Sequence, residues 1–300
     1  MCEGTVRHKK IMPGGKPQKL RKRAYAGFLF VLPELIGVMI FYLIPYADVV
    51  RRSFVQAVGG EFVGLDNYRQ ILHNQAFLLA AGNTLWFVAV CLPLLLALSL
   101  SVAVLLVRQL RGKDLLKSAY LMPLAIPAAS VVLLWQLLFD NHGILNGVLE
   151  FLHIGGRDWM NTNAAFGVLV FSYIWKNLGY DVILWMAGLA GIPKSIYEAA
   201  RVDGAGNWKC FWSITLPNIR PVAFTIVVLS FLNSFKVFRE AYLVAGSYPH
   251  ESIYLLQHVF NNWFQELSVD KMSAGSVLLS FVIVAFVILL QKSWDKEESI

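Results

Sequence analysis

Long apolar runs separated by polar segments organise this sequence. An α-helix needs about 20 apolar residues to cross the hydrocarbon core of a bilayer. Six runs are long enough to do so. The pattern therefore predicts six transmembrane helices, at residues 28–46, within 78–107, and at 118–139, 166–189, 222–243 and 273–290.

Proline and polar residues interrupt the third and fourth runs. Pro123 and Pro127 remove backbone donors, which predicts a kink packed against neighbouring helices. Lys176, Asn177 and Asp181 lie within the fourth run, and we expect them to face another helix or an aqueous cavity rather than lipid. Lys176 and Asp181 are about 140° apart around a helix, so we do not expect them to pair with each other.

The second half of the fifth run is the most polar part of any of the six. It carries Asn233, Ser234, Lys236, Arg239 and Glu240. A further polar segment, 245–271, has Ile253, Leu256, Phe260 and Phe264 at helical spacing. This spacing predicts a short helix on the membrane surface.

Composition supports a membrane protein. The chain is 57% hydrophobic and only 15% charged, whereas soluble domains carry about 25% charged residues. The net charge of +7 has an ordinary cause here, because lysine and arginine gather at the cytoplasmic ends of membrane spans. We therefore expect a lipid bilayer as partner and no nucleic acid.

The distribution of basic residues predicts the topology. With both termini, the turn after the second run and the segment 193–221 placed inside, those regions hold 18 of the 26 Lys and Arg residues, and the outside, counting Arg239 at the outer end of the fifth run, holds six. This bias predicts both termini in the cytoplasm. The expected organisation is a basic tail at 1–26, a transmembrane domain at 27–292 and a C-terminal tail at 293–300. The first apolar run is expected to be an uncleaved helix rather than a signal peptide.

The segment 193–221 is the one long polar and aromatic interruption between apolar runs. Ser195 and Glu198 have the spacing of a capping box, which predicts a helix start at Ser195. Gly204 suits the left-handed turn that ends a helix, so this first helix is about ten residues long. A helix that short is marginal alone and should dock on a partner.

A second short helix is expected after the glycines of this segment. Asn207 is predicted to cap it and Pro217 to end it. Helical spacing should bring four side chains onto one largely aromatic face: Trp208, Phe211, Trp212 and Thr215.

Several positions in 193–221 match a known pattern. Glu198, Ala199 and Ala200 are followed by Gly204, and then by Ile214, Leu216 and Pro217. This pattern resembles the EAA motif of the membrane subunits of ABC importers. The form EAARVDGA at 198–205 is similar to that of the carbohydrate-importer branch, which includes the maltose and glycerol-phosphate permeases. Looser similarities to that branch are GLDNY at 64–68, GILN at 143–146, WKNLGY at 175–180 and NSFKVF at 233–238.

The resemblance implies a fold and a set of partners. The fold would be the all-α, six-helix, type I permease fold of the maltose permease, in a multi-pass subunit of a bacterial-type cell membrane. The partners would be a second permease in a heterodimer, a cytoplasmic ATPase dimer and an extracytoplasmic sugar-binding protein. ATP and Mg²⁺ would bind to the ATPase, and this sequence has no phosphate-binding loop of its own. No catalytic residue or metal site is expected in this chain.

The resemblance also assigns roles to residues. The first helix of 193–221 would be the coupling helix that docks into the ATPase, and Glu198 would pair with a basic residue there, complete the capping box, or do both. The residues expected at this contact are Ser195, Glu198, Ala199, Ala200, Asp203, Gly204, Ala205 and Pro217. Asn233, Phe235 and Lys236 offer amide, aromatic and charged groups for a sugar, although contacts between helices explain them equally well.

Two other classes of function fit this sequence less well. A self-contained transporter driven by an ion gradient would use Lys176, Asp181 and Lys236 as a polar relay, but it leaves the EAA pattern unexplained. A membrane enzyme has little support, because the external histidines are scattered along the sequence. These are His73, His142, His153 and His250.

Overall fold

The computed structural model describes residues 17–107, 119–123 and 125–298. Within these ranges the chain forms helices joined by turns, and its only strand-like pairing is an isolated bridge between Val55 and Phe62. In chain order the elements are α1 (Pro17–Val38), a π-helical turn η1 (Met39–Leu43), α2 (Ile44–Arg52), α3 (Asp66–Leu72), α4 (Gln75–Val107), α6 (Ala128–Phe139), α7 (Ile144–Phe151), α8 (Ala164–Ala190), α9 (Lys194–Val202), α10 (Asn207–Cys210), a π-helical turn η2 (Phe211–Thr215), α11 (Leu216–Asn218), α12 (Arg220–Ser234), a 3-10 turn η3 (Phe235–Val237), α13 (Phe238–Ala245), a 3-10 turn η4 (Glu251–Ile253), α14 (Leu256–Gln265) and α15 (Val269–Glu298).

Four helical segments of the described chain are long and apolar enough to cross a membrane. They are Phe28–Arg52, Gln75–Val107, Arg220–Ala245 and Val269–Trp294. They confirm the first, second, fifth and sixth apolar runs as candidate spans. The helix of the fourth run, α8, has 27 residues and is about 40 Å long, but Lys176, Asn177 and Asp181 reduce its mean hydropathy.

The third apolar run is interrupted at Pro127, and the break is more complete than the kink that its prolines predicted. The chain is helical at 119–123, but Pro127 is extended (φ −57°, ψ 144°) and α6 begins only after it. Pro127 has no N–H to continue the helix and restricts Ile126 to non-helical backbone. The 12 residues of α6 extend about 18 Å, less than the roughly 30 Å of a hydrocarbon core.

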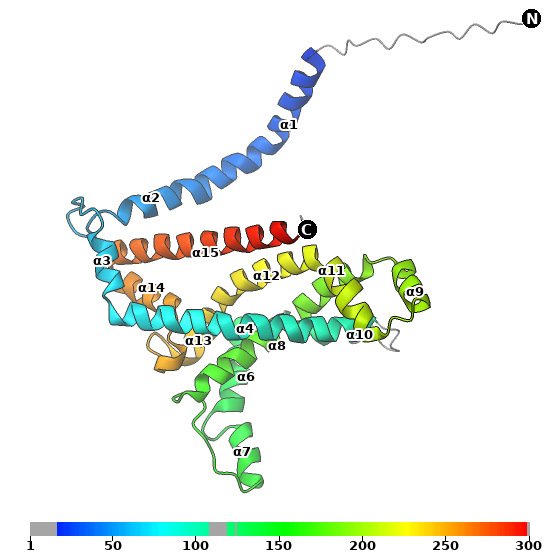
Figure 1. Cartoon of the computed structure of the whole chain (residues 1–300). Helices are drawn as coiled ribbons and strands as arrows, with labels where there is room; N and C mark the ends of the chain where they lie inside the picture. The colour runs from blue at the N-terminus through cyan, green and yellow to red at the C-terminus, as the bar shows by residue number, and fades with distance from the viewer. Residues whose placement is uncertain (1–16, 108–118, 124, 299–300) are drawn as a thin grey trace, which may run out of the picture.

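The first helix stands apart from the rest of the molecule. It begins at Pro17, inside the segment 1–26 that was predicted as a tail. None of its most apolar window within Phe28–Arg52 is buried, and α1 leads away from the other helices in Figure 1. Helix α2, at the end of this helical stretch, lies beside α15.

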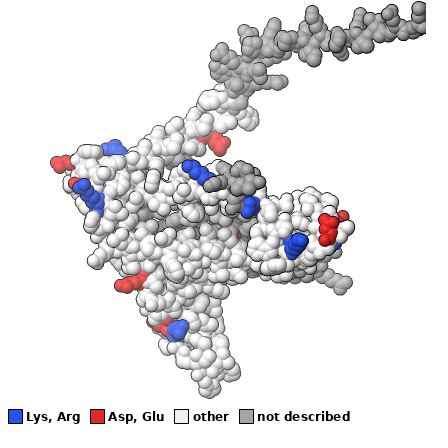
Figure 2. Space-filling model, in the orientation of Figure 1, with Lys and Arg blue, Asp and Glu red and all other residues white. Residues whose placement is uncertain are grey.

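The other long helices connect two ends of the molecule. Figure 1 shows α3 and α14 at one end of the molecule, and α9 to α11 with the C-terminus at the other. Figure 2 shows that Lys, Arg, Asp and Glu are sparse over the middle of the visible face and lie mostly toward its extremities. This distribution is the one expected for a protein whose middle lies in lipid.

Helices α4 and α8 form the centre of the packing. Trp185 of α8 donates its indole N–H to Ser99 Oγ of α4 at 3.0 Å, and Phe87 meets Tyr173 edge to face at 5.5 Å. Gly179 of α8 lies against the Tyr120 carbonyl, where a Cβ would overlap backbone atoms. A glycine is therefore required at this helix contact.

Helix α14 confirms the short helix predicted within 245–271. It packs against α4 and α15, with Trp263 stacked on Phe77 at 5.9 Å. His258 is fully buried, and its Nδ1 accepts a hydrogen bond from the Leu255 N–H at 3.1 Å. Burial lowers the pKa of His258 to about 4, so the ring is neutral at physiological pH.

Candidate functional site

Helix α9 is attached to the molecule through one side. Tyr197 packs, partly buried, on a core cluster that includes Leu189, Ile192 and Ile219. Its hydroxyl lies 2.9 Å from Thr215 Oγ1 of η2. These contacts place α9 between the end of α8 and the start of α12.

The start of α9 differs from the prediction. Pro193 (φ −61°, ψ 133°) is the N-cap, Lys194 is the first helical residue, and no side-chain capping hydrogen bond forms. A capping residue must have non-helical backbone, whereas Ser195 is already inside the helix. The predicted capping box of Ser195 and Glu198 was therefore wrong, because the helix begins directly after Pro193.

The end of α9 confirms the role of Gly204. This glycine has φ +79°, its N–H bonds to the Arg201 carbonyl at 3.0 Å, and the Ala205 N–H bonds to the Ala200 carbonyl at 2.9 Å. These two bonds form the Schellman motif, which needs a left-handed residue at this position. A side chain there would meet no atom within 4 Å, so only the backbone conformation requires glycine.

The other side of α9 is open. Ser195, Glu198, Ala199, Asp203 and Gly204 are exposed, while Ala200 and Ala205 are half-buried. Val202, the last residue of α9, is apolar and yet 88% exposed. The structure thus places the predicted coupling residues from Ser195 to Ala205 on α9 and in the turn that ends it, while Pro217 is exposed on α11.

The helix after the glycines also begins and ends differently. Gly206 (φ −72°, ψ 167°) is the N-cap of α10, and Asn207 is its first residue rather than its cap. Pro217 does not end the helical path, because η2 leads directly into α11, where a proline near the start is tolerated. Only Ile219 separates α11 from α12.

The predicted aromatic face is present. Trp208 lies 6.3 Å from Phe211 and 5.8 Å from Trp212, measured between ring centroids. Trp208 is 74% exposed, and Thr215 is buried in the contact with Tyr197. The aromatic side chains thus cover the outside of this turn, and the threonine joins it to α9.

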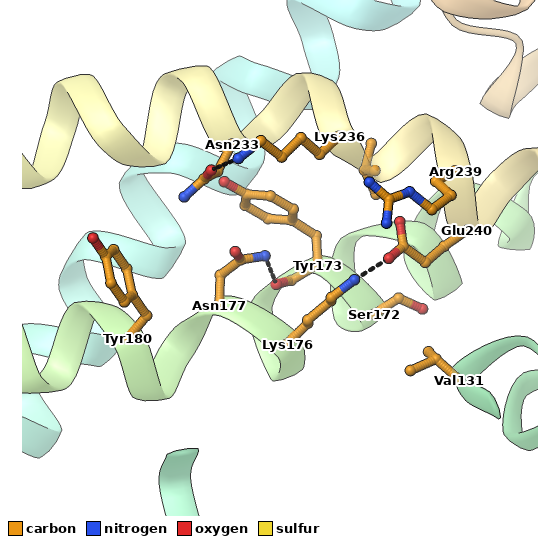
Figure 3. A pocket seen from close by; sticks show the side chains of 11 residues that line it. Val131, Ser172, Tyr173, Lys176, Asn177, Tyr180, Asn233, Lys236, Arg239 and Glu240 are labelled. Carbon is orange, nitrogen blue, oxygen red and sulfur yellow. Dashed lines mark hydrogen bonds and ion pairs between the residues drawn. The ribbon is translucent and has the colours of Figure 1, made fainter. Parts of the chain in front are cut away.

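A polar cavity of about 380 Å³ lies between α6, α8 and the α12–α13 segment. Asn233 and Lys236 line it, and Lys236 Nζ donates to Asn233 Oδ1 at 2.7 Å. Phe235 does not line it: its ring packs on Phe231 at 5.4 Å, and Phe231 contacts Phe286 of α15. The cavity is lined by Val131, Ser172, Tyr173, Lys176, Asn177, Tyr180, Asn233, Lys236, Val237, Arg239 and Glu240 (Figure 3).

An ion pair between Lys176 of α8 and Glu240 of α13 crosses this cavity (Figure 3). Sequence reasoning did not find this pair, nor the place of Tyr173 in the lining. The signal available was that opposite charges in two different spans each need a partner.

Asp181 has a different partner. Its Oδ2 accepts a hydrogen bond from Ser230 Oγ of α12 at 2.8 Å, and the Tyr173 hydroxyl donates to the Ser230 carbonyl at 2.7 Å. This confirms that Lys176 and Asp181 do not pair with each other and that Asp181 faces a neighbouring helix. The two bonds to Ser230 hold α8 against α12.

Comparison with known proteins identifies the family. The profile of the binding-protein-dependent transport system inner membrane component matches residues 89–296. The trehalose/maltose transport system permease protein MalF of Thermococcus litoralis is 30% identical over 94% of this chain and 98% of its own length. The sn-glycerol-3-phosphate transport system permease protein UgpA of Yersinia pestis is 30% identical over 87% of this chain and 91% of its own.

Two solved structures share the fold. A chain of a bacterial ABC transporter involved in the import of the acidic polysaccharide alginate superimposes with a TM-score of 0.81 at 20% identity, over 93% of this chain and 98% of that one. A chain of the alginate transporter in complex with an alginate pentasaccharide-bound periplasmic protein gives 0.78 at 20% identity, over 91% and 95%. The protein is therefore a multi-pass membrane protein that belongs to the family of inner-membrane components of binding-protein-dependent transport systems.

Proposed function

We propose that this chain is one of two permease subunits of an ATP-driven importer and forms half of the path for a sugar. The names of its relatives support a saccharide or a related polyol phosphate as cargo. The single observation that carries the proposal is α9, a short helix anchored on one side by Tyr197 and open on the other. Such a helix needs a partner to complete its packing.

In this proposal the open side of α9 docks on a separate ATPase dimer that binds ATP and Mg²⁺. Closure of the two ATPase subunits displaces α9, and Tyr197 and the covalent connections pass the displacement to α8 and α12. These helices line the polar cavity, so its access changes with the ATP cycle. The sugar arrives on an extracytoplasmic binding protein, and a second permease, a different chain, supplies the other half of the path.

We further propose six membrane crossings in a bacterial cell membrane, with both termini in the cytoplasm. The fourth crossing is α8, and the third combines α6 with the residues before Pro127. Figure 1 supports this topology, because α9 and the C-terminus lie at the same end of the molecule. The bias of basic residues toward the proposed inside segments supports it as well.

The family does not favour the ion-driven transporter. The proposed relay of Lys176, Asp181 and Lys236 also lacks support in the contacts. These three residues bond to Glu240, Ser230 and Asn233 respectively, and not to one another.

Reconstitution tests the proposal. Proteoliposomes containing this chain, its partner permease and its ATPase, supplied with the binding protein, should take up sugar only with ATP and should be insensitive to uncouplers. Uptake by this chain alone, or uptake abolished by an uncoupler in the presence of ATP, would contradict it.

Cross-linking tests the docking side. A cysteine introduced by Glu198→Cys on α9 should cross-link to the ATPase, and one introduced by Phe151→Cys on α7, where Phe151 is 83% exposed, should not. The native Cys91 and Cys210 are buried and should give little background, and Cys2 is replaced by serine in both variants. Cross-linking from Phe151→Cys but not from Glu198→Cys would place the ATPase against α7 instead of α9 and would contradict the proposal.

A further inference from the structure

We infer that the polar cavity selects a sugar that carries an anionic group, a carboxylate or a phosphate. The inference rests on the proposed function, since it concerns the cargo of the same path. The names of the relatives do not decide the charge: maltose and trehalose are neutral, whereas glycerol-3-phosphate and alginate are anionic. The charges that face the cavity carry the inference.

Three cations and one carboxylate line the cavity. Lys176 and Glu240 neutralise each other through their ion pair, in which the side chains are 25% and 7% exposed. Pairing is the usual way in which charges inside a membrane protein are accommodated. The remaining cations are Lys236 and Arg239, so the cavity carries an excess of two positive charges.

No carboxylate of the described chain neutralises this excess. Lys236 Nζ donates to the neutral amide oxygen of Asn233, and Arg239 forms no ion pair with any carboxylate in the described ranges. Both side chains are exposed to the cavity. Figure 3 shows Asn233, Lys236 and Arg239 arranged along the α12–α13 side, facing the polar side chains of α8.

An anionic ligand compensates such a charge excess. A cavity lined by one sign of charge, with apolar surroundings, concentrates ions of the opposite sign. A guanidinium can donate two parallel hydrogen bonds to a carboxylate or a phosphate. Its hydrogen bonds to a neutral hydroxyl are weaker. Tyr180, Asn177 and Ser172 of the facing helix supply hydroxyl and amide groups for the uncharged part of a sugar.

The volume fits a small saccharide. The cavity of about 380 Å³ lies within the range of about 300–1,000 Å³ found for small-molecule sites. Tyr173 and Tyr180 add aromatic surface to the polar groups of the lining. Lys236 and Arg239 would thus hold the anionic group, and Tyr180 with its neighbours would contact the rest of the sugar.

The experiment uses the complete importer in proteoliposomes, with its partner permease, ATPase and binding protein. Four radiolabelled probes are compared: digalacturonate, sn-glycerol-3-phosphate, maltose and trehalose. The test variants are the double substitution Lys236→Gln with Arg239→Gln, and the charge-preserving Arg239→Lys. The control is Arg69→Gln, which removes one positive charge from α3, away from the cavity, where the Arg69 side chain is 78% exposed.

The expected result is ATP-dependent uptake of an anionic probe that the double variant reduces at least tenfold, equivalent to about 1.4 kcal/mol, because the variant removes both charged hydrogen-bond donors. Arg239→Lys should lose less, and Arg69→Gln should behave as the unmodified importer. Uptake of digalacturonate alone would identify a carboxylate as the anionic group, and uptake of glycerol-3-phosphate alone a phosphate.

Three results would overturn the inference. ATP-dependent uptake of a neutral probe without either anion would leave the proposed function intact and refute the anionic cargo. Equal loss of neutral and anionic uptake in the double variant would show that the cations contact an acidic group of the second permease instead. Absence of ATP-dependent uptake for all four probes would count against both the inference and the proposed function.

Discussion

The hydroxyl of Tyr197 lies 2.9 Å from Oγ1 of Thr215 and joins α9 to the η2 turn. Thr215 is buried and also bonds to the Cys210 carbonyl, so the contact connects a helix with an open face to a well-packed turn. In the proposed importer, a displacement of α9 is transmitted to the other helices through this contact.

Tyr197→Phe should weaken this connection. Removal of the hydroxyl costs about 0.5–1.5 kcal/mol of contact free energy and leaves the ring in the core. We expect ATP hydrolysis by the assembled importer to continue and uptake per ATP to fall several-fold, measured together in proteoliposomes. Tyr248→Phe, at a residue that is 74% exposed, should change neither rate. An unchanged ratio of uptake to hydrolysis in Tyr197→Phe would show that the hydroxyl has no part in coupling.

Gly204→Ala should impair uptake through backbone strain. Left-handed backbone costs a residue with a Cβ about 1–2 kcal/mol, and Gly204 has φ +79°. Gly206→Ala is the matched control, since Gly206 has an ordinary φ of −72° and equally open surroundings. We expect both variants to insert in the membrane, and only Gly204→Ala to lose ATPase binding in a pull-down. Equal binding by the two would contradict the requirement for a left-handed turn.

Gly179→Ala should disrupt helix packing. Its Cβ would overlap the Tyr120 carbonyl, and overpacking of this kind costs about 1–3 kcal/mol. Gly167→Ala, on the same helix with nothing within 4 Å, should be neutral or slightly stabilising. Thermal unfolding of the purified chain in detergent measures both. A lower Tm for Gly167→Ala than for Gly179→Ala would refute the close contact.

Stability should fall with acidification through His258. The pKa of this buried histidine is lowered to about 4, against about 6.5 for the unfolded chain. Its contribution is therefore complete above pH 6.5 and declines toward pH 4, because the unfolded state binds the proton first. The slope is about 1.4 kcal/mol per pH unit. His258→Asn keeps an acceptor near the Leu255 N–H and should flatten this part of the pH profile. Identical profiles for the two chains would mean that His258 is accessible to protons when folded.

The ion pair between Lys176 and Glu240 should show coupling. Glu240→Gln leaves a lysine without its carboxylate in the cavity, and Lys176→Gln leaves a buried carboxylate. Residues in contact typically show interaction free energies of about 0.5–3 kcal/mol, so the double variant should be more stable than additivity predicts. Thermal unfolding of all four chains gives the cycle, and strict additivity would argue against a pair in solution.

Much of the fold follows from local sequence. Four apolar runs form candidate spans because length and hydropathy suffice to specify them. Gly204 ends α9 as predicted because its conformation is a property of the residue itself. The assignment of α9 as a partner-binding element rests on spacing over twenty residues, Glu198 to Pro217, which the chain places on α9, the turn that ends it and the helical turns from α10 to α11.

The features that could not be predicted depend on competition between neighbours or on distant contacts. The spacing of Ser195 and Glu198 is compatible with a capping box, but Pro193 started the helix earlier. Phe235 lies about 200° around a helix from Asn233, and only its contact with Phe231 shows that it is the one that points away from the cavity. Lys176 and Glu240 are 64 residues apart, and only the crossing of α8 with α13 brings them together.

Ser230 gives the cavity a mechanical property. Residues two helical turns apart on α8, Tyr173 and Asp181, both bond to this one residue of α12. Rotation of α8 relative to α12 would break both bonds, whereas movement of the two helices together breaks neither. The two helices that face each other across the cavity are therefore held against twisting by a single residue of α12.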